Sequence, residues 1–97
     1  MVDVLLEQYD KGQQSFVIRN AKDKLAEMVM DISGNIITVY HTEVFPGAEG
    51  KGLGKILLKT MVEYARQNGL KVKPLCVFVQ AQFKRHPDLY SDLWQKG

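Results

Sequence analysis

The sequence of 97 residues has little cysteine, little histidine and no marked excess of either charge. Its one cysteine, Cys76, cannot form an internal disulfide, and one cysteine with two histidines is too few for a structural zinc site. Thirteen Lys and Arg residues against eleven Asp and Glu residues give a net charge of +2, which is too small to predict a nucleic-acid or membrane partner. We therefore expect no resident metal, and we expect any electrostatic role to be local.

Long apolar stretches are also missing. No run of about 18 consecutive apolar residues is present, so no membrane-spanning helix is expected. The first residues, MVDVLLEQYDKG, lack the basic start and apolar stretch of a signal peptide, which together with the lone cysteine predicts a reducing, cytoplasmic location. There is no internal repeat and no low-complexity linker, so we expect a single domain over residues 1–97.

Three segments in the first half of the chain have the composition of β-strands. The first is residues 15–19 (SFVIR). In residues 25–32 (LAEMVMDI), every second residue from position 26 is apolar, which predicts a strand with one buried face. Residues 36–45 (IITVYHTEVF) are rich in β-branched and aromatic residues. The short turn at residues 33–35 between the last two segments predicts a hairpin.

The second half of the chain has a different period. Apolar residues three and four apart predict a helix over residues 53–68, which Gly69 suits as its C-terminal end. Residues 70–79 (LKVKPLCVFV) are typical of a strand interrupted at Pro74, where pairing is expected to stop. Residues 80–94 predict a short helix, a break before Pro87 and another helical turn. The order β-β-β-α-β-α predicts an α+β domain with a helical crossover between two strands.

A glycine-rich segment, PGAEGKGLGK at residues 46–55, stands at the predicted strand-to-helix junction. It fails the Walker A pattern because Ile56 replaces the required Ser or Thr, and it fails the dinucleotide fingerprint because Lys55 replaces the third glycine. Its last three glycines are two apart: Gly50, Gly52 and Gly54. Their N–H groups at a helix start can converge on an anion, with added charge from two lysines. The pattern alone leaves a phosphate site and a plain tight turn both open.

The segments around these glycines carry a family resemblance. GKGLGKILL (50–58), HTEVF (41–45), PLCVFV (74–79) and RHPDLYSDLW (85–94) resemble the small YjdJ-type branch of the GCN5-related N-acetyltransferase (GNAT) superfamily. The resemblance implies a minimal GNAT fold of the α+β class, with a mixed, mostly antiparallel sheet, a crossover helix and a short C-terminal helix. It also implies an N-acetyltransferase that uses acetyl-CoA as co-substrate and acts on an amine acceptor that the sequence does not identify.

The same resemblance implies where acetyl-CoA binds. The family motif Gln/Arg-x-x-Gly-x-Gly/Ala falls on residues 49–54, so both glycines match and Glu49 does not. The pantetheine arm would enter a gap between a strand ending at residues 43–45 and a strand ending at residues 76–77. Its amides would pair with the free backbone of Val44 and Phe45. The pyrophosphate would be held by the amides of Gly50, Lys51, Gly52, Leu53, Gly54 and Lys55.

Acetyl transfer also needs a base, an oxyanion donor and a proton for the departing CoA thiolate. His41 and Glu43 lie two apart on one predicted strand and share a face, so either is a candidate base, directly or through water. A packed histidine with a structural hydrogen bond is the alternative for His41. By resemblance, the oxyanion donor is a backbone N–H in residues 43–45. Larger family members protonate the thiolate with a tyrosine on the following helix, and here that helix has none before Tyr90.

Cys76 is the candidate substitute for that tyrosine. It lies near the C-terminal end of the strand predicted over residues 70–79, where the cleft is expected. A thiol can give a proton to a thiolate, and as a thiolate it can accept the acetyl group. A lone cysteine is also commonly a small buried hydrophobe. The sequence leaves these three roles open.

Two features near the C-terminus complete the predicted site. Arg85 is a candidate contact for the 3′-phosphate of CoA, because arginine holds phosphate bidentately, and a solvated helix end is the alternative. Tyr90, Leu93 and Trp94 predict a patch that closes the core or contacts another copy, in a monomer or weak homo-oligomer. A non-catalytic acyl-CoA-binding or protein-interaction module on the same fold is the second functional hypothesis.

Overall fold

The structure, a computed structural model, describes residues 2–96, so residues 1 and 97 of the predicted domain lie outside the described residues. The strands are β1 (Val4–Gln8), β2 (Gln14–Arg19), β3 (Lys24–Ser33), β4 (Ile36–Val44) and β5 (Lys71–Pro74). The helices are α1 (Leu53–Gln67), α2 (Val77–Arg85) and α3 (Pro87–Tyr90), with a 3₁₀ turn at Asp10–Gly12. Within residues 2–96, no helix is both long enough and apolar enough to cross a bilayer.

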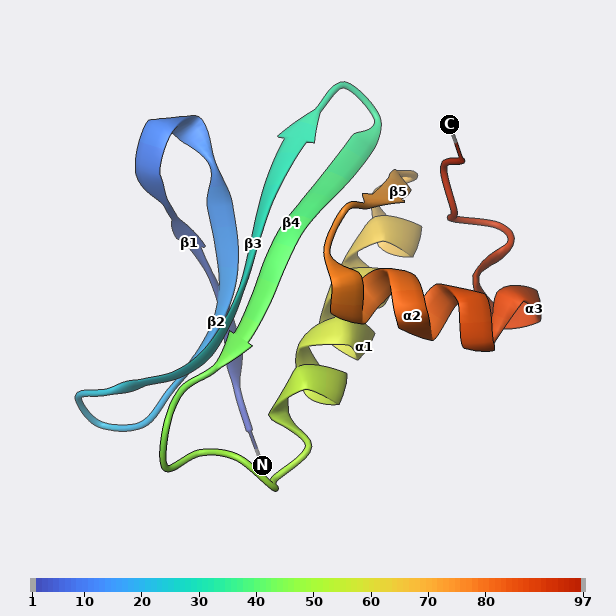
Figure 1. The fold of residues 1–97 in the computed structure, drawn as a ribbon. Coiled ribbons are helices and arrows are strands. Elements are labelled where there is room, and N and C mark those ends of the chain that lie inside the picture. The colour runs from blue at the N-terminus through green and yellow to red at the C-terminus, as the bar shows by residue number, and fades with distance from the viewer. Residues whose placement is uncertain (1, 97) are drawn as a thin grey trace.

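The five strands form one sheet in the order β1-β2-β3-β4-β5. Neighbours from β1 to β4 are antiparallel, and β4 pairs in parallel with β5 after the crossover through α1. In Figure 1, the strands β1 to β3 lie to one side of β4, and β5 and the helices lie to the other. The predicted α+β class, with a mixed and mostly antiparallel sheet and a crossover helix, is confirmed.

One face of the sheet, called here the core face, packs against the helices. Alternate residues of β2 and β3 reach it and are almost fully buried in one cluster with α1 and α2 side chains: Phe16, Ile18, Ala26, Met28 and Met30. The opposite face is called here the open face. It carries the intervening residues of β2 and β3 and their partners on β4: Ser15, Val17, Glu27, Val29, His41 and Glu43. Val17 and Val29 are buried outside that cluster, whereas His41 and Glu43 keep about half of their side chains exposed.

The central helix α1 follows from its apolar spacing. Leu57, Met61 and Ala65, four residues apart, are fully buried against the core face. The helix ends in a C-terminal motif in which Leu70 N–H donates to Ala65 O at 2.8 Å and Gly69 adopts φ +66°. Glycine takes this left-handed conformation without the steric cost that a side chain would add. The predicted helix and its glycine end are confirmed.

Strand β1 was not expected from the sequence. It pairs with β2 from Val4 opposite Ile18 to Gln8 opposite Gln14 and forms the edge of the sheet. Its segment, VLLEQ, lacks the alternation of apolar and polar residues that marks a half-buried strand, and Leu5 and Leu6 remain 51% and 42% exposed. Residues 4–8 form a strand because they pair with β2, and their own sequence pattern was not enough to predict it.

The strand predicted over residues 70–79 is too long. Strand β5 ends at Pro74, and the N–H groups of Leu75 and Cys76 both donate to Val39 O, at 3.1 and 2.9 Å. The parallel ladder stops there, and α2 begins at Val77. Cys76 therefore lies at the N-cap of a helix, and the second strand of the gap ends before it. The short apolar run PLCVFV is compatible with a strand and with the start of a helix, because its periodicity does not distinguish the two.

The C-terminal patch closes the core, which was one of the two roles predicted for it. Phe83 is fully buried, stacks on Tyr90 with ring centroids 4.5 Å apart, and meets Trp94 edge-on at 5.7 Å. Trp94 also forms a parallel bridge with Val72 of β5. The end of the chain is thereby tied to both α2 and the sheet.

Candidate active site

Strands β4 and β5 part halfway along β4. They pair only from Ile36 opposite Lys71 to Val39 opposite Pro74. A bulge follows at Tyr40, which has no residue opposite it because Val39 pairs with Met30 and His41 with Val29. The edge of β4 beyond the bulge is therefore not covered by β5, and two pockets lie along it.

The glycine segment has the conformation of an anion-binding turn. Gly50 and Gly52 adopt φ +80° and +70°, which strains any residue with a side chain, and Gly52 is the N-cap of α1. The first helical bond runs from Ile56 N–H to Gly52 O at 3.1 Å. The amides of the first turn, residues 53–55, therefore have no partner in the helix and carry its partial positive charge.

Gly54 serves a different purpose from Gly50 and Gly52. Its φ lies outside the left-handed region, but a Cβ atom there would come within 3.3 Å of Cζ of Phe78. That distance is tighter than ordinary van der Waals contact, so the absence of a side chain lets the first turns of α1 and α2 approach closely. The aromatic ring is thereby held beside the glycine turn.

The first pocket, called here the glycine pocket, has a volume of about 390 Å³. It brings together six residues that the sequence placed at the cofactor: Val44, Gly50, Gly52, Leu53, Gly54 and Lys55. Glu49, Ala48 and Phe78 complete its walls. Lys51 is exposed and does not line it.

Glu49, the residue that departs from the family motif, is engaged within the turn. Its Oε1 accepts a hydrogen bond of 2.8 Å from Gly47 N–H. Gly47 precedes the amides of residues 50–55, so the carboxylate is held by the start of the loop and not by the helix end. The mismatch at this position leaves the first-turn amides of α1 free.

The backbone of Val44 and Phe45 differs in its availability. Phe45 N–H donates to Leu25 O at 2.9 Å, and Phe45 O accepts from Ala48 N–H at 3.0 Å. The expectation of a free Phe45 backbone is therefore wrong. Val44 and Ala26 form a non-hydrogen-bonded antiparallel pair, so the backbone N–H and C=O of Val44 point away from β3. Val44 thus presents its N–H and C=O to the uncovered edge.

The second pocket, called here the thiol pocket, has a volume of about 460 Å³ and continues from the first past Phe78, which lines both. Its walls are Tyr40, His41, Thr42, Leu75, Cys76, Val77 and Phe78. Cys76 is only 4% exposed, and its Sγ lies 3.3 Å from Thr42 Oγ1, within hydrogen-bond distance for sulfur. Cys76 and His41, two of the three predicted catalytic residues, therefore share one pocket.

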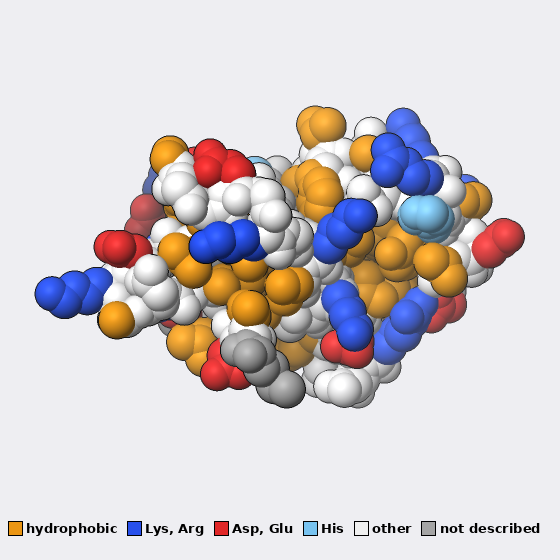
Figure 2. Space-filling model, turned by 90° about the horizontal axis from the view of Figure 1, so that it is seen from below, with side chains coloured by type: hydrophobic (Ala, Val, Ile, Leu, Met, Phe, Trp, Pro, Cys, Tyr) orange, Lys and Arg blue, Asp and Glu red, His pale blue; other side chains and the backbone are white. Residues whose placement is uncertain are grey.

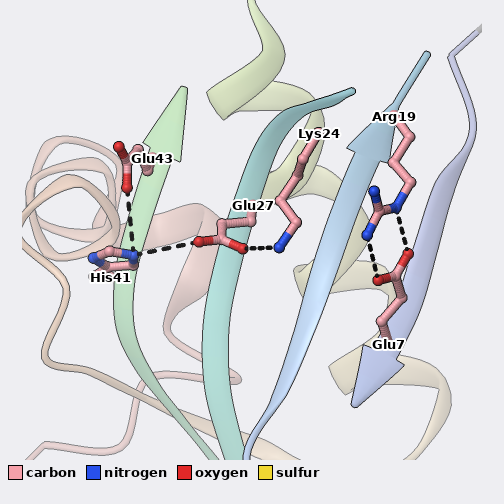
Figure 3. Close-up of polar contacts among 6 residues, drawn as sticks. All are labelled: Glu7, Arg19, Lys24, Glu27, His41 and Glu43. Atoms are coloured by element: carbon pink, nitrogen blue, oxygen red, sulfur yellow. Dashed lines mark hydrogen bonds and ion pairs between the residues drawn. The ribbon is translucent and has the colours of Figure 1, made fainter. Parts of the chain in front are cut away.

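His41 lies between two carboxylates on the open face (Figure 3). Its Nε2 is 3.9 Å from Glu43 Oε1 and 3.9 Å from Glu27 Oε2. The predicted shared face of His41 and Glu43 is confirmed. Glu27, on the neighbouring strand, was missed because its role depends on the pairing of β3 with β4, although a charged residue among the apolar ones of β3 was a visible signal. These three residues are called here the notch.

Glu27 is the buried member of the notch. Its side chain is 6% exposed, and Lys24 Nζ lies 2.9 Å from its Oε1. Burying a carboxylate is costly unless it is paired, and Lys24 supplies the partner. The donor atoms of Glu27, His41 and Glu43 lie within 4.8 Å of one another, a spacing and donor type that a divalent cation can use. The ammonium of Lys24 already offsets one of the two carboxylate charges.

Arg85 is an exposed residue at the end of α2 and does not line either pocket. A groove of about 460 Å³ between α1 and the α2–α3 segment gathers the basic residues Lys55, Lys59 and Arg66 instead, together with His86, and Arg66 is paired there with Asp92 at 3.1 Å. Figure 2 shows Lys and Arg side chains bordering apolar surface, with one histidine, on the side of the molecule that carries α2 and α3. Lys55 lines both this groove and the glycine pocket, so the two adjoin.

Comparison with known families gives one match across most of the chain. A family model described as GCN5-related N-acetyl-transferase matches residues 15–93. Protein NATD1 from Homo sapiens is 24% identical over 82 residues, which cover 82% of this chain and 73% of that protein. NATD1 from Gallus gallus gives the same identity, with 74% of its length covered.

Solved structures give a concordant result. The solution structure of a GCN5-like protein from Staphylococcus aureus is 31% identical, covers 100% of this chain and 93% of its own, and has a TM-score of 0.70. The ribosomal-protein-S18-alanine N-acetyltransferase from Escherichia coli is 16% identical, covers 84% and 54% of the two chains, and has a TM-score of 0.63. The second likeness concerns the fold alone.

Proposed function

Because the chain belongs to the GCN5-related N-acetyltransferase family, we propose that it transfers the acetyl group of acetyl-CoA to an amine. The observation that carries the proposal is the continuity of two pockets along the uncovered edge of β4. One pocket is built on the free amides at the start of α1, and the other holds Cys76 and His41. A cofactor with a phosphate end and a thioester end fits that order.

The cofactor would bind from the glycine pocket toward the thiol pocket. The amides of residues 50–55 would hold the pyrophosphate, since they converge at a helix N-terminus. The pantetheine arm would pair with the Val44 backbone and pass Phe78, which places the thioester beside Cys76. Lys55 and Lys59, which line the adjoining groove, are better placed for the remaining phosphate than Arg85, which faces solvent.

The reaction would use residues of the thiol pocket and the notch. The amine nitrogen attacks the thioester carbonyl, and His41 or Glu43 takes the proton that the nitrogen loses. The carbon–sulfur bond then breaks, and CoA leaves as a thiolate. Cys76 would give it a proton from Sγ and recover one through Thr42 Oγ1, 3.3 Å away. The amide product and CoA carry all the atoms of the two substrates.

Calorimetry with acetyl-CoA and CoA tests the placement of the cofactor. Gly52→Asp adds bulk and negative charge where the pyrophosphate would lie, so we expect it to abolish binding. Gly34→Asp is the matched control, because Gly34 also has positive φ, at +59°, but stands in the β3–β4 turn. The control variant should bind as the wild type does. Equal affinity of both variants would refute this placement, and no binding to the wild type at millimolar ligand would refute the function.

A further inference from the structure

His41 belongs to both the thiol pocket and the notch. The charge and the apolar surface around it indicate which kind of amine would bind there. We propose that the acceptor is a hydrophobic primary amine, with an alkyl or aryl group next to a single ammonium. This inference rests on the proposed function, since it names the substrate class of the same site. It draws on two independent features of the surface, one charged and one apolar.

The charged feature is the notch. Glu27 and Glu43 each bring one negative charge, and Lys24, 2.9 Å from Glu27, brings one positive charge. With His41 counted as neutral, one net negative charge remains, which matches a single ammonium and not a polycation. Glu27 Oε2 and Glu43 Oε1 both lie 3.9 Å from His41 Nε2. An ammonium seated between the carboxylates would therefore be held beside the histidine.

The apolar feature is the rim of the thiol pocket. Val77 is 83% exposed, Leu75 52% and Tyr40 41%, and all three line the same pocket as His41. Val77 is the first residue of α2, and Leu75 precedes its N-cap. Both residues are apolar and strongly exposed, although Leu75 also lines a second pocket with Pro74 and Trp94.

The rim suits the acceptor better than the acyl group. The thioester would lie beside Cys76, which is 4% exposed, so the acetyl group is placed deep in the pocket. Tyr40, Leu75 and Val77 lie farther out, with 41% or more of each residue in contact with solvent. A group that contacts them while its nitrogen reaches His41 must extend outward from the notch. An alkyl or aryl substituent of the amine has that position.

A matched pair of acceptors tests the proposal. Hexylamine and 5-aminopentan-1-ol have similar length and one ammonium each, but only hexylamine has an apolar end. We expect kcat/KM to be about tenfold or more higher for hexylamine, since its terminal methyl is buried where the hydroxyl of the other amine would lose its hydrogen bonds to water, and a single such group has an effect of this size in a specificity pocket. Spermidine, which carries several charges, should be a poorer acceptor than either. Equal kcat/KM for the three amines would overturn the proposal.

Variants assign the preference to the rim. Val77→Ser and Leu75→Ser should each raise KM for hexylamine severalfold and should raise KM for 5-aminopentan-1-ol less, because only hexylamine has an apolar end that loses its contact. Val2→Ser is the control, because Val2 is a 44% exposed apolar residue that lines neither pocket. Glu43→Gln should raise KM for both amines. A hexylamine preference that survives both rim variants would place the apolar contact elsewhere and overturn the proposal.

A binding measurement separates this inference from the proposed function. Saturation-transfer NMR of hexylamine and 5-aminopentan-1-ol with the protein–CoA complex needs no turnover. Preferential binding of hexylamine that is lost in Val77→Ser, with no acetyl transfer, would support the acceptor site and refute the transferase. Transfer to both amines with equal kcat/KM would refute the acceptor site and support the transferase. Absence of binding to both amines would overturn the inference.

Discussion

At the scale of single residues, the site depends on positions whose role comes from backbone conformation or from burial. Gly50 and Gly52 were predictable because glycines two apart at a helix start are typical of a turn that brings backbone amides together. Cys76 was predicted at the cleft, but on a strand, and the structure moves it to the N-cap of α2. Glu27 was not predicted, because only the pairing of β3 with β4 brings its carboxylate to His41.

Replacing Cys76 tests the proton-donor role. Cys76→Ala should lower kcat by about a hundredfold or more while leaving the affinity for CoA unchanged, since general acid catalysis contributes on that order. Steady-state kinetics with calorimetry for CoA would measure both quantities. Thr42→Val removes the hydroxyl 3.3 Å from the thiol and should have a smaller effect in the same direction. Radiolabel from acetyl-CoA that stays on Cys76 of the wild type would contradict proton donation and favour an acetyl-cysteine.

The left-handed glycine at the start of α1 affects stability as well as binding. Gly52→Ala should lower the free energy of unfolding by about 1–2 kcal/mol, because an L-residue is strained at φ +70°. Gly34→Ala, at φ +59°, should cause a similar loss. Urea denaturation measures both, and only Gly52→Ala should also weaken CoA binding. A Gly52→Ala protein as stable as the wild type would mean that the turn relaxes to another conformation.

At the scale of elements, the strands with a buried face and the central helix could be predicted from the sequence, whereas the edge strand β1 and the length of the edge strand β5 could not. The alternation in β3 and the spacing in α1 each reflect burial on one side, which the sequence records directly. Strand β1 has no such pattern because it is a partly exposed edge. The length of β5 could not be read because Pro74 stops the ladder while the apolar run continues into α2.

An ion pair links the edge strand β1 to β2 and should make its attachment depend on pH. Glu7 Oε2 accepts from Arg19 Nε at 2.9 Å and Glu7 Oε1 from Arg19 Nη2 at 3.0 Å, and these bonds lower the pKa of Glu7 below its usual 4.5. Because the pKa of Glu7 is lower in the folded state than in the unfolded state, the ion pair stabilises the folded state at pH values above the unfolded pKa of about 4.5. This stabilisation is lost as the pH falls through the pKa of the folded state.

Glu7→Gln should therefore increase amide exchange in β1 severalfold at pH 6, measured by NMR hydrogen exchange. At a pH well below 4.5, the wild type and the variant should exchange alike, because the carboxyl is then protonated in both states. Glu63→Gln removes the same charge from α1 and should leave β1 unchanged. The pair lies at the surface, with side-chain exposures of 38% for Arg19 and 30% for Glu7, so global stability should change little.

The C-terminal segment depends on one aromatic residue. Phe83 is fully buried and contacts the rings of both Tyr90 and Trp94. Phe83→Ala should lower the free energy of unfolding by about 3–5 kcal/mol, a large part of the stability of a small domain. Chemical denaturation measures the loss, and Lys84→Ala, an exposed neighbour, should change it by less than about 0.5 kcal/mol. A small loss in Phe83→Ala would mean that the C-terminal patch contributes little to the core.

At the scale of the whole molecule, the chain combines a proposed cofactor path with a sheet face on which no described helix packs. Its radius of gyration, 12.9 Å, is that expected for a domain of about 100 residues. The helices of residues 2–96 pack on or beside the core face, so His41 and Glu43 of the notch remain about half exposed on the open face, while Glu27 is 6% exposed. The resemblance to GCN5-related N-acetyltransferases predicted the proposed cofactor path from sequence. The proposed acceptor site needed the structure, because it joins His41 and Glu43, which the sequence predicted, to Glu27 and to residues 75–77.

A CoA titration of the ¹⁵N-labelled protein tests the central claim most directly. The account predicts that the amide signals that move most belong to Val44, to residues 50–55 and to residues 76–78, with a weaker response in the groove near Lys55. It also predicts that Gly52→Asp removes these changes and that Gly34→Asp keeps them. Shifts absent from the glycine pocket, or confined to a surface away from the uncovered edge of β4, would contradict the account.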